Sequence, residues 1–423
     1  MKKTQRYLGF LLLIAILCFG MFFLSSSMLY FRLLAGCTLG YALSRGYMGF
    51  AGSVNRAYAT GSTKLMRTLM FLFFVTALLS TAVLFNADAT TFDLWVNPVN
   101  LGLILGGLLF GFGMTFSSCC ASGVLTDLVS ALPRALITLV FFCAGVFVGF
   151  PLQNTQKWIT DSWFTSKTGE AIGYKGVYFP DWFAWDGLGG YLGALILTGI
   201  LCLIVVLLSY AYENKRKAAG TYSNHFSENA QQAEEKEKLE DKHVGFFTEE
   251  NYRRMFVRSW SMKKASMVIA GVFVVLMGVT KAGWGASTPY GFWFGKALML
   301  FGVDAESIAA FTHGKPDPYV MPFFEHPINV QNVGIVLGTL FFLLTAGIFA
   351  DTFKASLKIS GKQACFYVLG GFLMGFGTRL SNGCNVGALY TPIANFSLSG
   401  WVFLIFLVVG GICGNMVAKK AKL

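Results

Sequence analysis

The sequence is poor in charged residues. Only 13% of its 423 residues are Asp, Glu, Lys or Arg, whereas soluble proteins usually carry about 25%. The deficit is uneven, because residues 212–264 carry 20 of the 54 charged side chains and the other 370 residues share 34. A chain with so little charge cannot cover a water-exposed surface, so a soluble enzyme is excluded. The 42 Phe and 48 Gly favour closely packed helices in a bilayer, and we expect an all-α polytopic membrane protein.

Motifs of energy coupling and catalysis are also missing. The chain has no GxxxxGK[ST] phosphate-binding loop and no CxxC pair, so the sequence supports neither an ATP-driven pump nor a dithiol redox motif. Its four His are isolated in the linker and the loops, which is not a metal-binding pattern. We therefore expect no catalytic residues, no metal and no cofactor.

Apolar stretches of about 20 residues, the length that crosses a bilayer core, occur ten times. The expected spans are 8–27, 28–45, 66–85, 101–118, 134–151, 187–210, 265–283, 331–350, 364–380 and 399–418. Three further stretches, 46–58, 119–131 and 384–396, are too short or too rich in glycine and polar residues to cross. We therefore predict about nine to ten transmembrane helices with short re-entrant helices between them.

Basic residues orient these spans. The net charge of +12 comes from Lys and Arg in tails and loops between apolar stretches, as the positive-inside rule expects. Lys2, Lys3 and Arg6 place the N-terminus inside. The loop 86–100 has no Lys or Arg and is therefore external. Ten crossings then place both termini and residues 212–264 in the cytoplasm.

These features divide the chain into six segments. They are a first transmembrane helix (1–27), a first repeat (28–151), an outer loop with a connecting helix (152–211), a charged cytoplasmic linker (212–264), a second repeat (265–418) and a cytoplasmic tail (419–423). The composition of the linker favours a solvated tether that is partly disordered and partly helical. The alternative is a docking site for a cytoplasmic partner.

The two repeats share a glycine-rich motif. GGLLFGFGMTFSSCCASG at 106–123 and GGFLMGFGTRLSNGCNVG at 370–387 are identical at nine of eighteen positions without a gap. The predicted crossings run inward at the first copy and outward at the second, so the copies are inverted. Inverted repeats with broken helices and a binding site near the membrane midplane are a recurrent transporter architecture. We therefore expect the copies to meet at a central constriction.

Each copy of the motif contributes one cysteine, Cys120 or Cys384. A thiol is soft, polarizable and a weak donor, and a helix that starts at the cysteine would present N–H groups to an anion. These features suit a small anion with an exposed sulfur or selenium atom, held by S–H···S contacts or by transient exchange. Polar neighbours would add hydrogen bonds without fixed charge: Ser117, Ser118, Ser381, Asn382 and Asn385. The alternative is that these small residues only permit close helix packing.

Two other functions stay open. Cys119 is adjacent to Cys120, and with Cys384 this pair suggests a membrane thiol-redox protein as the alternative, although a vicinal disulfide is strained. The linker suggests a third possibility, a membrane scaffold that recruits a soluble protein through residues 212–264.

Charged residues near the motifs carry separate predictions. Arg379 and Arg45 are ionisable groups at the ends of expected spans. Such groups are candidate functional residues, unless their side chains snorkel to the interface. Asp127, in the short segment after the first motif, is a candidate to relay a proton or to pair with Arg134.

At these residues the sequence resembles the YeeE/YedE family of sulfur-transport-domain membrane proteins. The resemblance rests on GGLLFGFG…CCASG at 106–123 and GFGTRLSNGCN…TPIANFSLSGW at 375–401, and the second element looks especially like the YedE branch. It implies an hourglass-shaped protein of the bacterial inner membrane that takes up thiosulfate or, in the YedE branch, selenium compounds. It also implies that Cys120 and Cys384 pass the anion along by S–H···S hydrogen bonds, and that a cytoplasmic sulfur carrier of TusA type is a partner.

The sequence departs from the family at one position. The family commonly has a third cysteine in an Arg-x-x-x-Cys-Phe element, which here reads Arg45-Gly-Tyr-Met-Gly49-Phe50. Gly49 therefore stands where a cysteine is expected, and Cys37 and Cys119, the possible substitutes, are not at that position. The choice between thiosulfate and a selenium compound consequently stays open.

Overall fold

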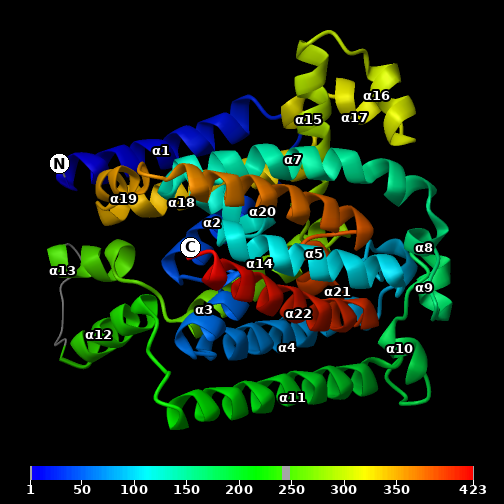
Figure 1. Cartoon of the computed structure of the whole chain (residues 1–423), viewed down its shortest axis with the longest axis horizontal. Coiled ribbons are helices and arrows are strands. Elements are labelled where there is room, and N and C mark those ends of the chain that lie inside the picture. The colour runs from blue at the N-terminus through cyan, green and yellow to red at the C-terminus, as the bar shows by residue number, and fades with distance from the viewer. Residues whose placement is uncertain (1, 241–247, 423) are drawn as a thin grey trace.

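The computed structural model describes residues 2–240 and 248–422, and this part of the chain is all-helical (Figure 1). The long helices are α1 (Lys2–Phe22), α2 (Ser27–Arg45), α4 (Lys64–Leu84), α5 (Leu101–Ser117), α7 (Leu132–Thr155), α11 (Tyr191–Ala218), α14 (Met262–Thr280), α18 (Pro327–Ala346), α20 (Gly361–Leu380) and α22 (Leu398–Lys420). The β-bridges in the described residues are isolated pairs and build no sheet.

Shorter helices connect or interrupt the long ones. They are α3 (Gly52–Thr60), α6 (Ala121–Ser130), α8 (Lys157–Thr160), α9 (Lys167–Ala171), α10 (Phe179–Trp182), α12 (Phe226–Glu240), α13 (Glu249–Tyr252), α15 (Thr288–Leu300), α16 (Ala305–Thr312), α17 (Asp317–Val320), α19 (Phe349–Ser356) and α21 (Thr391–Ala394). Single turns of 3-10 or π-helix are η1 (Ala89–Thr91), η2 (Arg253–Val257), η3 (Phe323–Glu325) and η4 (Asn385–Tyr390).

In the described chain, eight helices are long and apolar enough to cross a membrane. They are Lys3–Phe22, Lys64–Leu84, Leu101–Ser130, Leu132–Thr155, Tyr191–Ala218, Met262–Thr280, Pro327–Ala346 and Leu398–Lys420. The other two predicted spans, 28–45 and 364–380, correspond to α2 and α20, helices of 19 and 20 residues. Glycines, polar residues and arginines make these two helices less apolar than the eight. Both pack against neighbouring helices of the bundle, α2 along most of its length and α20 mainly over its second half.

The helices α5 and α20, which carry the two copies of the glycine motif, cross each other in antiparallel orientation. A Cβ atom built at Gly106 would lie 2.7 Å from the carbonyl oxygen of Gly377, and one at Gly113 would lie 2.6 Å from that of Gly370. Contacts therefore run backwards along α20 as they run forwards along α5. Glycine is needed here because only a residue without a side chain permits such close backbone approach.

The remaining long helices pack in reciprocal pairs. The helix α7 packs on α20, and α22 packs on α5. In the same way α2 packs on α18, and α4 packs on α14. Each of the long helices α2, α4, α5 and α7 thus packs against a long helix of residues 262–420, and Figure 1 shows the helices of the two halves interleaved in one bundle.

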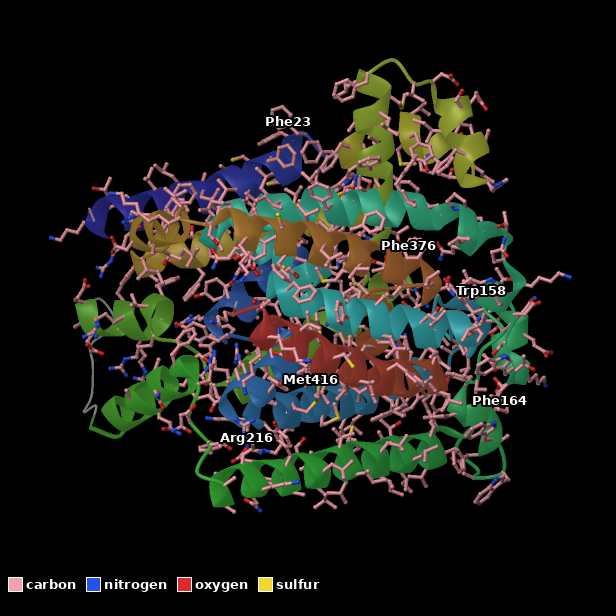
Figure 2. The ribbon with its side chains drawn as sticks, in the orientation of Figure 1. Phe23, Trp158, Phe164, Arg216, Phe376 and Met416 are labelled. Atoms are coloured by element: carbon pink, nitrogen blue, oxygen red, sulfur yellow. The ribbon has the colours of Figure 1, made fainter. Side chains whose placement is uncertain are left out.

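Several segments gather at the two ends of the bundle. The N-terminus, α12, α13 and α19 lie at one end in Figure 1, and α8, α9 and α10 lie at the other. Figure 2 shows Arg216 near the first end and Trp158 and Phe164 at the opposite end. The polar linker and the aromatic loops are therefore separated by the length of the bundle, as the charge distribution predicts for two sides of a membrane.

The helix α11 forms an outer edge of the bundle (Figure 1). Its exposed side chains are large and apolar, among them Leu203, Ile204, Leu207 and Leu208. Water would not favour so continuous an apolar face, but lipid would.

The first part of the linker is docked on the helical core. The hydroxyl of Ser62 donates to both carboxylate oxygens of Glu228, at 2.8 and 2.9 Å. The side-chain amide of Gln231 donates to the carbonyl of Gly46 at 3.2 Å. The side chain of Glu228 is buried. This part of the linker is therefore a helix that packs on the core and is not a solvated tether. Residues 241–247 of the predicted linker lie outside the described residues.

Candidate functional site

Each glycine-rich helix breaks immediately before a cysteine. Ser118 follows α5 with φ 54°, and Asn382 follows α20 with φ 55°, and both occupy the same position of the motif. The next short helix begins after Cys120 in the first copy and after Cys384 in the second, and each cysteine is the N-cap residue with extended backbone. Both thiols therefore sit at the N-terminus of a short helical segment, where backbone N–H groups are free of helical partners.

Two of the predicted polar residues stabilise these breaks. The hydroxyl of Ser117 donates to the carbonyls of Gly113 at 3.3 Å and Cys119 at 3.5 Å. The hydroxyl of Ser381 donates to the carbonyls of Gly377 at 2.8 Å and Gly383 at 3.0 Å. Both serines are buried, so in this geometry their hydroxyls satisfy backbone acceptors at the break and are not turned toward an open space.

A cavity of about 700 Å³ lies beside the first cysteine. Of the predicted site residues, Gly49, Ser118, Cys119 and Cys120 line it. The predicted residues that do not line it are Ser117, Ser381, Asn382, Asn385, Cys384 and Arg379. The polar and charged lining residues that the motif did not indicate include Asn55, Arg56, Ser122, Asp127, Arg134, His225 and Thr339. The first repeat therefore supplies most of the lining, and the rest comes from α18 and α19 of the second half and from the start of α12.

The thiol of Cys120 lines the cavity, and the thiol of Cys384 lies outside the lining but within electrostatic range of Cys120. Cys120 and Cys384 are both buried, with 1% of their surface exposed, and they are near enough to interact electrostatically with each other. The sulfur of Cys120 lies 3.5 Å from the hydroxyl oxygen of Ser122. The hydroxyl of Tyr290 donates to the carbonyl of Ala121 at 2.7 Å and lies within electrostatic range of both thiols. All nine cysteines of the chain are free thiols in this structure.

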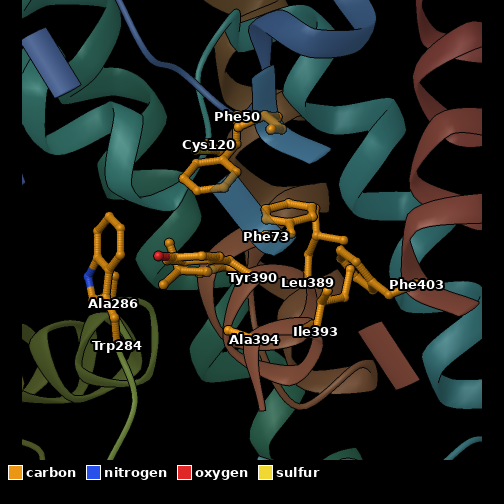
Figure 3. Packing of buried hydrophobic residues seen from close by; sticks show 14 of the residues in the cluster. Phe50, Phe73, Cys120, Trp284, Ala286, Leu389, Tyr390, Ile393, Ala394 and Phe403 are labelled. Atoms are coloured by element: carbon orange, nitrogen blue, oxygen red, sulfur yellow. The ribbon is translucent and has the colours of Figure 1, made fainter. Parts of the chain in front are cut away.

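An aromatic cluster holds the segment that follows Cys384 (Figure 3). The ring of Tyr390 lies 6.0 Å from that of Phe50, 5.7 Å from that of Phe73 and 5.0 Å from that of Phe273. Its hydroxyl lies 2.9 Å from the hydroxyl of Thr76. Rings at these separations pack favourably, so η4 is fixed between helices of both halves and positions Cys384 rigidly.

Arg379 belongs to a polar network on the Cys384 side. Its Nη1 donates to Oε1 of Gln153 at 3.2 Å, and Nε2 of Gln153 donates to Oδ1 of Asn382 at 2.6 Å. Arg379 is buried and interacts electrostatically with Cys384, so its side chain does not snorkel to an interface. Its Nη2 is buried and has no hydrogen-bond partner among the described residues.

The predictions for the charged residues Arg45 and Asp127 have different outcomes. The guanidinium of Arg45 donates to the carbonyls of Arg254 at 3.0 Å and Arg258 at 2.8 Å. Arg45 is thus buried beneath the end of the linker and anchors it, which neither of the alternatives predicted. Asp127 pairs with Arg134 at 2.7 Å, as one of its alternatives predicted.

Arg56 and His225 are among the lining residues that sequence reasoning missed. Arg56 lies on α3, in a stretch taken only as a short re-entrant helix, and its position in a segment flanked by Gly52 and Gly61 was the available signal. His225 precedes α12 in the linker, and only the docking of that helix brings it to the cavity. No periodic pattern connects residues so distant in the chain.

The eight membrane-length helices of the described chain define a multi-pass membrane protein, in which two equivalent helix breaks carry the thiols of Cys120 and Cys384. The chain belongs to the sulphur transport family, whose model matches residues 45–413, and this is a family of transporters rather than of enzymes. The predicted resemblance is thereby confirmed.

Curated relatives agree with this assignment. The chain is 28% identical over 166 residues to the "Probable transporter YedE" of Escherichia coli, a match that covers 38% of this chain and 40% of that relative. It is 23% identical over 396 residues to the "Thiosulfate transporter TsuA" of Spirochaeta thermophila, covering 90% and 97%. The "Thiosulfate transporter TsuA" of Escherichia coli is 20% identical, covering 91% and 93%. The matched part spans about 40% of the length of the YedE relatives.

Proposed function

We propose that this protein is a membrane facilitator for the uptake of a small sulfur- or selenium-containing anion. The observation that carries the proposal is the placement of Cys120 and Cys384 at equivalent helix breaks, beside a cavity and within electrostatic range of each other. Full-length relatives named as thiosulfate transporters support the substrate class.

The path runs between two inverted repeats, 28–151 and 265–418. The antiparallel crossing of α5 and α20 and the reciprocal helix pairs support this arrangement. Ten crossings, with α2 and α20 as shielded interior spans, give an hourglass whose constriction lies at the two thiols. Both termini and the linker then face the cytoplasm of a bacterial inner membrane.

The chemistry of the constriction suits passage rather than trapping. Thiols and helix N-termini attract a soft anion without a full charge, and conduction requires binding weak enough to release. The anion would form S–H···S contacts first with Cys384 and then with Cys120 on its way to the cavity. Gly49 has no neighbour within 4 Å of a Cβ built on it. The cavity therefore has room where the family commonly carries another thiol, which leaves both thiosulfate and selenium compounds as substrates.

Uptake measurements with single cysteine variants test this function. Cells that depend on the protein receive labelled thiosulfate, selenite or sulfide, and Cys120→Ala and Cys384→Ala should each lower uptake of the transported anion by about tenfold or more, the effect of losing a contact of roughly 1.5 kcal/mol. The control is Cys202→Ala, which removes a buried thiol on α11 far from the motif.

Two results would count against the proposal. The thiol role is wrong if both variants take up every anion as fast as the parent protein. Failure of the parent protein to take up any of the three anions would exclude the function itself.

A further inference from the structure

The cavity beside Cys120 is lined by a guanidinium group that forms no ion pair with a described residue. Arg56 lines the cavity, and its Nη2 donates to the carbonyl of Tyr47 at 3.0 Å. A Cβ built at Gly52 would lie 2.9 Å from Nε of Arg56, and Tyr47 and Gly52 are lining residues too. The guanidinium itself therefore lies at the cavity wall. Its Nη1 is buried and has no hydrogen-bond partner among the described residues.

The other charges of the lining compensate each other. Asp127 and Arg134 form an ion pair at 2.7 Å. Burial and the neighbouring charge of Arg56 lower the pKa of His225 to about 4, so this imidazole is neutral at pH 7. Among the described lining residues, Arg56 thus supplies a positive charge that no other lining residue pairs with. The carboxylate of Glu228 is not a lining residue and accepts hydrogen bonds from Ser62, but it lies within electrostatic range of Arg56 and offsets part of this charge.

We propose that Arg56 forms a second anion-binding station, on the linker side of the cavity, which receives the anion after it leaves the thiol of Cys120. The proposal rests on the proposed function and adds a residue that the cysteine motif does not contain. The ligand class is a small oxyanion, because a guanidinium presents hydrogen-bond donors in a planar fork that matches two oxygens of such a group. The thiols contact the soft end of the anion, and Arg56 contacts its oxygens.

The geometry also limits how tightly Arg56 binds the anion. One of the donors of Arg56 is already used by Tyr47, and the nearby charge of Glu228 reduces the positive potential. An anion held by a partly compensated charge at the mouth of a cavity can leave it again, as transport requires. In contrast, Arg379 on the far side of the thiols lies beside Gln153, outside the cavity lining.

Kinetics in proteoliposomes test this station, with labelled thiosulfate as the probe. Arg56→Gln should raise the KM for uptake by about tenfold, because a charge-assisted hydrogen bond is lost. Arg56→Lys keeps the charge but loses the planar pair of donors, so its KM should lie between those of the parent protein and Arg56→Gln, about threefold above the parent protein. Glu228→Gln should shift KM in the opposite direction, lowering it about twofold. The control Lys64→Gln removes a positive charge at the start of α4, outside the cavity lining, and should leave KM unchanged.

Binding measured by calorimetry in detergent separates this station from the proposed function. If the parent protein transports no thiosulfate but binds it, and Arg56→Gln abolishes that binding, the proposed function fails and the station stands. Equal KM and equal binding in the parent protein and Arg56→Gln would overturn the station. It is also overturned if Lys64→Gln raises KM as much as Arg56→Gln, since the effect would then be general surface charge.

Discussion

The two cysteines occupy equivalent positions of the motif but lie in different surroundings. Cys120 lines the cavity, whereas Cys384 is buried outside the lining and lies within electrostatic range of Arg379. The motif predicted that both residues would begin a short helix, because the residue types at the break recur. It did not predict the difference in surroundings, because that depends on side chains from other helices.

Gly49 gives a prediction at the scale of one residue. Because a Cβ there meets no atom within 4 Å, Gly49→Cys should fold with a thermal midpoint within about 2 °C of the parent protein, in line with the small effect of substitutions that create no clash. The new thiol should face the cavity and react with a small methanethiosulfonate reagent, which peptide mapping by mass spectrometry detects.

The parent protein is the control, since its native cysteines report the background labelling. A midpoint that falls by more than about 5 °C would contradict the geometry of the cavity. The same conclusion would follow if the peptide that carries the substituted position stayed unlabelled in the folded variant.

At the scale of elements, the crossing of α5 and α20 depends on residues without side chains. Gly113 and Gly370 approach each other closely enough that no Cβ fits at either position. The sequence predicted close packing from the repeated glycines. It also predicted that the two copies meet, but it could not state which glycine of one copy faces which residue of the other, because a glycine stripe has the same composition whatever helix it contacts.

Replacing one glycine of the crossing should destabilise the protein. In Gly113→Ala the added Cβ would lie 2.6 Å from a backbone oxygen of Gly370, and such overpacking typically costs about 1–3 kcal/mol. We expect a lower midpoint of thermal unfolding in detergent. The matched control is Gly271→Ala on α14, where a Cβ meets nothing within 4 Å, so the better helix propensity of alanine should leave stability unchanged or slightly raised. Equal midpoints for the two variants would refute the close crossing.

The first part of the linker packs on the core more closely than its composition predicts. Its composition predicted a solvated tether, partly disordered and partly helical, because such sequences bury too little apolar surface to fold alone. Glu228 and Gln231 are nevertheless buried, since the core offers Ser62 and a backbone carbonyl as partners. Docking of α12 is therefore a property of the surface that receives it rather than of the linker composition.

At the scale of the whole molecule, the reciprocal helix pairs build a cavity wall from both halves. The lining includes Cys120 of the first half and Thr339 of the second. The hydroxyl of Ser44 on α2 donates to that of Thr339 on α18 at 2.9 Å, which ties the halves together. The cavity is therefore lined by both halves, as the proposed path between them requires.

The orientation of the chain can be tested by labelling from each side of the membrane. Thr165→Cys in the loop between α8 and α9 and Asn224→Cys in the linker place thiols at exposed positions on either side of α11. An impermeant maleimide should label the first only from outside and the second only from the cytoplasmic side, as the distribution of basic residues predicts. Labelling of both from one side would mean that α11 does not cross.

The sequence by itself determined the class of molecule, the approximate helix positions and the two cysteine motifs. Composition decides whether a chain belongs in lipid, and helix length follows from the bilayer thickness. A gapless match of nine positions locates a repeat because equal local sequence forms equal local structure. These are local properties, because each depends on residues that are consecutive in the chain.

Only the tertiary structure decided which residues line the same cavity. Arg56 and His225 are 169 positions apart in the chain, and docking of the linker brings both to one cavity. Ser117 and Ser381, which the motif offered as anion ligands, instead donate to the carbonyls of their own helix breaks. The physical reason is that a buried donor must be satisfied, and which acceptor satisfies it depends on backbone geometry and on helices distant in sequence.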